Sequence, residues 1–104
     1  MYARNVMLNL KADSAGAFTK TLEKSVLPIL RKQAGFKDEI SFVAANGKEA
    51  VAISLWDNKE NAERYSREAY PAILKSLHEV VEGTPTVKSF DVSNSTFHKI
   101  AAQI

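Results

Sequence analysis

The sequence contains no cysteine, and this absence excludes several kinds of site. A chain without thiols forms no disulfide, holds no metal through thiolates and has no cysteine nucleophile. Such a composition is typical of a reducing compartment, so we expect a cytoplasmic protein. No apolar run approaches the roughly 18 residues of a membrane-spanning helix, and we expect no membrane partner. The start, MYARNVMLNLKAD, has polar residues among its apolar ones and lacks the pattern of a signal peptide.

Excess charge and histidine are also scarce. The 14 lysine and arginine residues are scattered among 12 aspartate and glutamate residues, which gives a formal charge of +2. Nucleic-acid-binding proteins usually concentrate basic residues on one face, so we expect no nucleic-acid partner. His78 and His98 are the only histidines, and although Glu82 follows His78 by one turn, nothing else completes a set of metal ligands. We therefore expect no metal and no cofactor.

The length and apolar content are those of one globular domain. The chain has 104 residues, of which 45% are hydrophobic, and no repeat or linker divides it. We assign residues 1–95 to the domain and residues 96–104, TFHKIAAQI, to a C-terminal arm of the same domain. His98 lies in this arm, where we expect it to contact a partner subunit.

Alternating and helical patterns follow one another along the chain. Residues 2–10 alternate between an apolar and a mixed face, which predicts a strand. The dipeptide Asn46–Gly47 is a strong hairpin signal between two further strands. Apolar residues at helical spacing predict two helices, the first bent by Pro28 and the second interrupted by Pro71. The remaining boundaries that we predict are strands at 39–45, 49–56 and 86–95, a left-handed Gly35 after the first helix, an Asp57–Glu60 capping box, and a second-helix end at Gly83 and Pro85.

The order β-α-β-β-α-β predicts an α+β fold of the ferredoxin-like type, with one antiparallel sheet and both helices on one face. The helices leave the other face uncovered, yet the strand at 49–56 has no strongly polar residue on either face. Its two faces carry Val51, Ile53 and Leu55 on one side and Ala52, Ser54 and Trp56 on the other. A strand of this kind is normally buried on both sides. We therefore predict a homodimer in which a second sheet covers the first, a dimeric α/β barrel.

Several segments resemble the antibiotic-biosynthesis-monooxygenase-like family of the dimeric α/β-barrel superfamily. They are the GF after the first helix, WDNKENAERY at the start of the second, and GTPTVKSFDV, within a resemblance over residues 2–93. The resemblance implies an aromatic or polycyclic ligand, bound between the sheet and the second helix or inside the barrel. One interpretation is a cofactor-independent monooxygenase of quinol-type substrates. The alternative is a non-catalytic ligand-binding or interaction module, whose interior would be filled by its own side chains.

The first strand, ARNVMLNLK, resembles that of a haem-degrading branch of the same superfamily, where an asparagine at the position of Asn5 faces the pocket. That branch has a tryptophan where this chain has Tyr65 and a ligating histidine where it has Lys75. Lysine is protonated near neutral pH and is not a usual haem ligand. We therefore expect no haem.

Four residues are candidates for a site, each with a structural alternative. Trp56 is either a ligand wall and hydrogen-bond donor or a packing residue at the hinge between strand and helix. Tyr65 is a phenol donor for a pocket or a core tyrosine, and Asn5 binds a ligand or water or bonds across the dimer. His78 is a distant base or an ordinary surface histidine.

Arg4 and Asp91 fall on the first and the last predicted strand. Opposite charges on two strands of one sheet can pair across it. We interpret this pair as structural.

Overall fold

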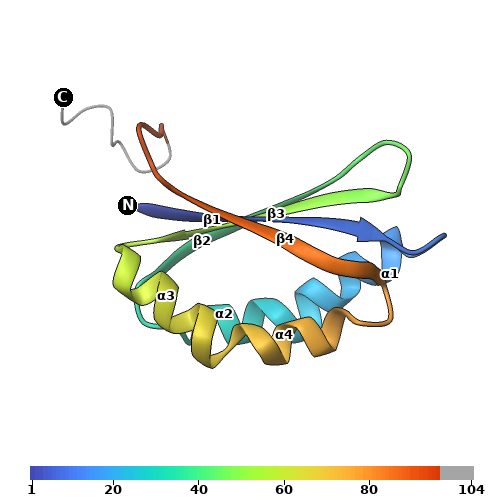
Figure 1. Ribbon diagram of the computed structural model, residues 1–104, viewed down its shortest axis with the longest axis horizontal. Helices are drawn as coiled ribbons and strands as arrows, with labels where there is room; N and C mark the ends of the chain where they lie inside the picture. The colour runs from blue at the N-terminus through green and yellow to red at the C-terminus, as the bar shows by residue number, and fades with distance from the viewer. Residues whose placement is uncertain (97–104) are drawn as a thin grey trace.

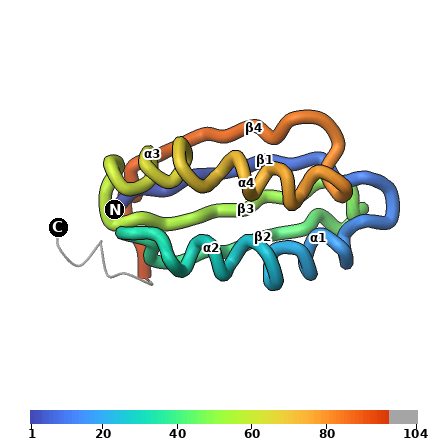
Figure 2. The backbone as a smooth tube through the Cα atoms, turned by 90° about the horizontal axis from the view of Figure 1, so that it is seen from below, coloured from blue at the N-terminus to red at the C-terminus, as the bar shows by residue number. Residues whose placement is uncertain are grey.

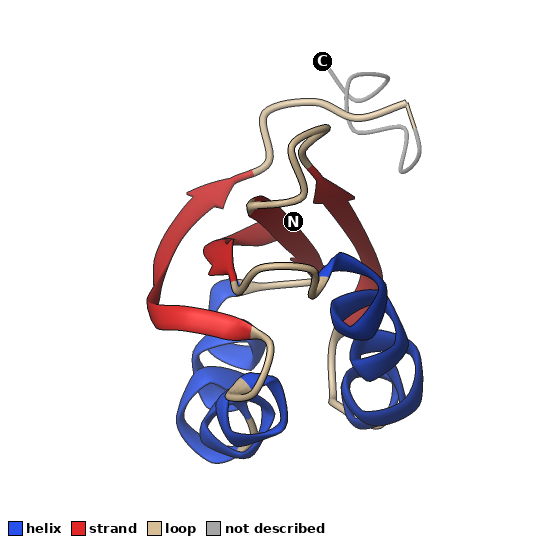
Figure 3. Cartoon of the chain, turned by 90° about the vertical axis from the view of Figure 1, so that its right-hand side faces the viewer, coloured by secondary structure: helices blue, strands red, loops and turns tan. Residues whose placement is uncertain are grey.

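The computed structural model describes residues 1–96 and has one four-stranded antiparallel sheet with helices below it (Figure 1). The elements are β1 (Tyr2–Leu10), α1 (Ala15–Thr21), η1 (Leu22–Val26), α2 (Leu27–Arg31), β2 (Phe36–Val43), β3 (Glu49–Trp56), α3 (Lys59–Glu68), α4 (Tyr70–Leu77) and β4 (Val81–Asp91). The strand order is β2-β3-β1-β4. All helical segments lie on one side of the sheet (Figure 3), which confirms the predicted α+β ferredoxin-like fold.

The first helical region contains a π-helical turn, η1, between α1 and α2. The amide of Leu27 donates to the carbonyl of Leu22, five residues earlier, immediately before Pro28. Proline has no amide hydrogen for the next helical bond, so the wider turn takes up the disruption and α2 begins around Pro28. The helix is therefore interrupted next to Pro28, the residue at which the sequence predicts a bend. Gly35 follows with φ 81°, in the left-handed region that we expected.

The second helical region divides into α3 and α4 at Ala69, next to Pro71, as predicted. Its start differs from the prediction. Asn58 is the N-cap, and its side chain accepts a hydrogen bond from the amide of Asn61 at 2.9 Å. Asp57 instead accepts from the side chain of Asn61, so the predicted capping box is wrong. Figure 2 shows α3 and α4 beneath β1, with α1 and α2 alongside β2.

Two strands have the predicted bounds and two do not. β1 and β3 match, and the hairpin at Asn46–Gly47 joins β2 to β3. β2 lies three residues earlier at its start than predicted, and β4 begins at Val81 rather than at residue 86. Gly83, which we took as the end of a helix, lies inside β4 with φ 68°, where the pairing with β1 changes register. The glycine accommodates a bulge there.

The core lies between the covered face of the sheet and the helices. Phe18 of α1 and Trp56 of β3 are its largest fully buried side chains, with Leu8 and Leu10 from β1 and Ile73 from α4 around them. The division of the chain into residues 1–95 and an arm at 96–104 stays a prediction, because the arm and His98 fall outside the described residues apart from Thr96.

The other face of the sheet is apolar and open. Met7 and Phe42 are 55% and 52% exposed, and Ile40 and Phe90 are similar. The registers Ile40 with Ile53 and Phe42 with Val51 join these side chains into one surface, which we call the open face. Among the described residues, no helix is long and apolar enough to cross a membrane.

Candidate functional site

A small cavity lies between the covered face of the sheet and the helices. Its volume is about 40 Å³. Such a space holds a few water molecules or one small oxyanion group and is far below the roughly 300–1,000 Å³ of a pocket for a drug-sized ligand. Its walls carry a polar group of five side chains, namely Arg4, Glu39, Ser54, Tyr65 and Tyr70, and an apolar group of seven, namely Val6, Leu22, Val26, Leu30, Ala52, Ile73 and Leu77.

Arg4 of β1 is the most unusual residue of the cavity because it is only 3% exposed. The strand alternation places it on the covered face, and its guanidinium carbon lies 5.0 Å from the ring centroid of Tyr65 and 4.4 Å from that of Tyr70. Lys59 and Glu63 form an ion pair, and no carboxylate among residues 1–96 is seen to pair with Arg4. The expected pair with Asp91 is therefore wrong. Asp91 stands opposite Tyr2 in the register, and the side chain of Arg4 turns inward instead.

The two tyrosines that Arg4 contacts are held in their neutral form. Burial raises the pKa of Tyr65 to about 12, and the charge of Arg4 opposes this rise. Burial also raises the pKa of Tyr70, again against the charge of Arg4. The Tyr70 hydroxyl is buried and has no hydrogen-bond partner among the described residues. Arg4 lowers the pKa of Tyr70 chiefly through its charge, and its guanidinium also lies over the Tyr70 ring, where a cation–π contact is worth roughly 0.5–2 kcal/mol.

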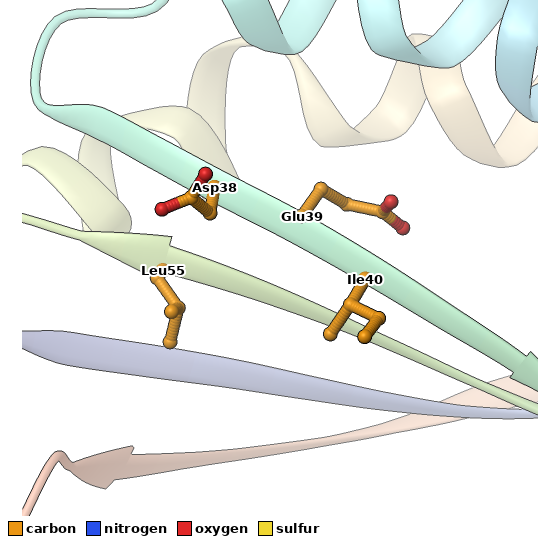
Figure 4. Close-up of a pocket in the computed structure, with 4 residues that line it drawn as sticks. All are labelled: Asp38, Glu39, Ile40 and Leu55. Carbon is orange, nitrogen blue, oxygen red and sulfur yellow. The ribbon is translucent and has the colours of Figure 1, made fainter. Parts of the chain in front are cut away.

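Glu39 of β2 connects the cavity with the surface. Its carboxylate accepts a hydrogen bond from the Ser41 hydroxyl, which lowers its pKa, but burial has the larger effect and raises it. Glu39 also lines two open hollows beside β2, of about 420 and 360 Å³. Figure 4 shows the larger hollow, with Glu39 on the helix side of β2 and with Ile40 and Leu55 on the opposite side.

Trp56 stands behind the cavity. It is 0% exposed, its ring packs 4.9 Å from that of Tyr65 and 5.6 Å from that of Phe36, and it does not line the cavity. The indole N–H donates to the Ser54 hydroxyl at 2.9 Å. Trp56 and Tyr65 are therefore adjacent, as a shared site requires. The indole N–H, however, donates to Ser54 and not to a ligand.

Asn5 and His78 lie away from these residues. Asn5 follows Arg4 on β1, so its side chain is on the open face, beside Ile53 of β3 and Lys88 of β4. Its side-chain oxygen is buried without a hydrogen-bond partner among the described residues. His78 caps the C-terminal end of α4 and is exposed. The four candidates thus occupy three places, and their functional roles stay predictions.

Sequence reasoning missed Arg4, Glu39 and Tyr70 as members of the site. For Arg4 a signal was present, because the alternation of residues 2–10 puts it on the same face as Val6, Leu8 and Leu10. A cation in that series is either at a strand end or buried. Glu39 and Tyr70 had no comparable signal, since their positions depend on how β2 and α4 pack.

The cavity is suited to hydrogen-bond donation. A guanidinium and three hydroxyl groups line it, and the carboxyl group present has a raised pKa. Donors in a water-poor enclosure can stabilise a developing or resident oxyanion. Within residues 1–96, no three histidine, aspartate or glutamate side chains are grouped to hold a metal ion.

The proteins that this chain is similar to are found by structure and not by sequence. No protein-family model and no curated protein matches the chain. The monooxygenase from the gene ActVA-Orf6 of Streptomyces coelicolor, solved with the ligand nanaomycin D, superposes with a TM-score of 0.77, at 11% identity over 90% of this chain and 88% of that one. SnoaB, a cofactor-independent oxygenase from Streptomyces nogalater, superposes at 0.74, with 11% identity over 91% and 95% of the two chains.

A predicted antibiotic biosynthesis monooxygenase from Nitrosomonas europaea gives a TM-score of 0.73, with 13% identity over 88% of this chain and 89% of that one. All three comparisons cover most of both chains, so they concern the whole fold and not a fragment. Identities this low carry no residue-by-residue correspondence. The chain has the ferredoxin-like fold of the antibiotic biosynthesis monooxygenase structures, as the sequence resemblance predicts.

Proposed function

We propose that this protein is a cytoplasmic homodimer that binds an aromatic or polycyclic molecule between its sheet and helices and oxygenates it without a cofactor. The observation that carries the proposal is the cavity beside Arg4, Tyr65 and Tyr70, which is lined by hydrogen-bond donors together with apolar side chains. A quinol-type anion would itself supply electrons to O₂. The protein would then need to bind the substrate, exclude water and stabilise negative charge.

The similar structures support this chemistry. One is a cofactor-independent oxygenase, and another is a monooxygenase solved with nanaomycin D. The likeness is one of fold, and folds of this kind host several functions. The chemical part of the proposal therefore depends on the donors that this chain places in its own cavity.

The open face supports the dimer. Its exposed side chains Met7, Ile40, Phe42 and Phe90 form a contiguous apolar surface with the half-buried residues of β3. Apolar surfaces of this kind usually mark an interaction site. A second copy placed face to face would cover each sheet with the other, and it would offer partners to the unpaired side-chain oxygen of Asn5.

A second candidate function has an observation in its favour. The cavity is only about 40 Å³, because Tyr65, Tyr70 and the helix side chains occupy the space beside the sheet. A filled interior is what a non-catalytic interaction module of this fold would have. The oxygenase requires that the side chains from α2 and α4 separate to admit a ring.

Oxygen uptake separates the two candidates. We expect the protein to accelerate O₂ consumption by naphthalene-1,4-diol above the rate without protein, measured with an oxygen electrode in metal-free buffer. Ala52→Val adds two methyl groups to the cavity wall and should remove this acceleration. Ala72→Val, on the exposed side of α4, is the matched control and should keep it. A wild-type protein that neither binds the quinol nor accelerates uptake would leave the non-catalytic module as the function.

A further inference from the structure

Arg4 is a permanent cation buried without a carboxylate in ion-pair contact among residues 1–96. The residue is only 3% exposed, so nearly all of it is buried. Arginine does not lose its proton in proteins, so burial cannot neutralise it. Two tyrosine faces contact the guanidinium at 4.4 and 5.0 Å, but a ring face supplies only a partial compensation for lost water.

The groups around Arg4 can donate hydrogen bonds to the same small space. The Tyr70 hydroxyl is buried without a partner among the described residues. The Ser54 hydroxyl accepts from the Trp56 indole, which leaves its own proton free for an acceptor in the cavity. A planar guanidinium beside two hydroxyl donors matches the oxygens of a carboxylate or a phenolate.

Glu39, the one carboxyl group on the cavity wall, does not take the place of such an anion. It accepts its hydrogen bond from Ser41, which is on the same strand, and makes no ion pair with Arg4. Because burial raises the pKa of Glu39, its neutral form is favoured relative to an exposed glutamate. An anionic ligand that enters the cavity is therefore attracted by Arg4. The carboxyl group of Glu39 repels it less than an exposed carboxylate would, because burial disfavours the ionised form of Glu39.

We propose that Arg4 binds the oxyanion of an aromatic ligand, with the Tyr70 and Ser54 hydroxyl groups as additional donors. This inference rests on the proposed function only in taking the cavity as the ligand site. The substrate class becomes narrower, since the ring must carry a carboxylate or a phenolate. The cavity of about 40 Å³ has the size of that head group, and the ring can follow only if side chains that line the cavity on the helix side move.

Calorimetric titration of the wild-type protein with matched probes tests the inference. Benzoate and 4-nitrophenolate carry the two possible head groups, and benzamide is the neutral counterpart of benzoate. The buffer must contain no carboxylate. We expect at least one of the two anions to bind about tenfold or more tightly than benzamide, and the better of the two identifies the head group.

Variants of Arg4 assign that preference to one side chain. Arg4→Gln should bind benzoate and benzamide equally, and Arg4→Lys should retain an intermediate preference, because it keeps the charge and loses the planar fork. Arg67→Gln, which removes an exposed arginine from α3, is the control and should behave as wild type. If Arg4→Gln does not fold, the inference is still tested by the preference of the wild-type protein for anions over benzamide and by the reduction of this preference in Arg4→Lys.

The outcomes separate this inference from the proposed function. Equal binding of anions and benzamide, or unchanged selectivity in Arg4→Gln, would overturn the anion site, even if quinol-dependent O₂ uptake persists. Selective benzoate binding without any O₂ uptake would support the anion site and refute the oxygenase. A wild-type protein that binds none of the three probes would overturn the anion site as well.

Discussion

Replacing Trp56 by phenylalanine separates the two interactions that the indole makes. The side chain is 0% exposed, packs against Tyr65 and Phe36, and donates to Ser54 at 2.9 Å. Phenylalanine keeps one ring but has three fewer heavy atoms, worth roughly 2 kcal/mol at about 0.8 kcal/mol per buried group. Loss of the hydrogen bond adds about 1 kcal/mol. We expect Trp56→Phe to cost about 2–3 kcal/mol and Trp56→Ala about 3–5 kcal/mol.

A double-mutant cycle with Ser54→Ala isolates the hydrogen bond. If the indole N–H is bound by Ser54, the two substitutions should couple by about 1 kcal/mol, since each alone already breaks the bond. Ser25→Ala, on the exposed side of η1, should show no coupling with Trp56→Phe. The free energies come from urea unfolding followed by far-UV circular dichroism. All proteins must be compared at one concentration, because a dimer's stability depends on it.

Two results would refute this account of Trp56. Strict additivity of Trp56→Phe and Ser54→Ala would mean that the indole donor is not committed to Ser54. A Trp56→Phe protein of unchanged stability that no longer binds the aromatic probes would mean that Trp56 contacts the ligand first. In either case the indole N–H would be available to a ligand oxygen.

Four further results are expected. Light scattering should give about twice the chain mass of 11.5 kDa, and Phe42→Glu on the open face should lower it, whereas a well-folded wild-type monomer would contradict the barrel. Haemin should associate weakly and without saturation of the Soret band, because the sequence resemblance implies Lys75 in place of the ligating histidine of the haem-degrading branch; a tight one-to-one complex would refute this. The pKa of Tyr65 is raised from 10.0 to about 12, so the contribution of Tyr65 to stability should be constant below pH 10 and fall by roughly 2–3 kcal/mol up to pH 12, as the unfolded chain ionises first; Tyr65→Phe should reduce the loss of stability in this range, and an unchanged slope would refute the assignment. Since burial raises the pKa of Glu39, folding works against its ionisation above its ordinary value of 4.5; Glu39→Gln should therefore unfold at higher urea than wild type at neutral pH, with the difference shrinking in acid, and a less stable variant would contradict this.

Much of the fold was predictable because its signals are local. Alternation defines β1, an apolar run defines β3, and Asn46–Gly47 specifies the turn that pairs β3 with β2. The start of β4 was not predictable in this way. Gly83 and Pro85 have the composition of a helix end, but the pairing of Leu10 with Val81 extends the strand backwards through a bulge. Because Leu10 and Val81 are far apart in the sequence, their pairing cannot be recognised from the residues around either of them.

The site was predictable only in part, for a related reason. Periodicity placed Tyr65 on the inward face of α3, and Trp56 at the end of β3 had to be near it, as the ring distance of 4.9 Å shows. Alternation also separated Asn5 from the covered face, but it could not show on which face a cavity would form. That depended on how far the side chains of the helices fill the space next to the sheet.

Arg4 gives the strongest physical reason to expect a ligand in this cavity. A buried cation without a carboxylate partner is costly, and replacing buried charges by apolar side chains of similar volume is often neutral or stabilising by about 1–4 kcal/mol. Packing alone would favour leucine or methionine beside Val6 and Leu8, and the tyrosine faces compensate only part of the cost. Proteins commonly retain such unfavourable groups where binding or catalysis needs them. The small cavity volume argues against a preformed ring pocket, whereas the charge argues against an interior that serves only packing. Both observations are satisfied if the head group of an anionic ligand is bound first and its ring is admitted by movement of the helices.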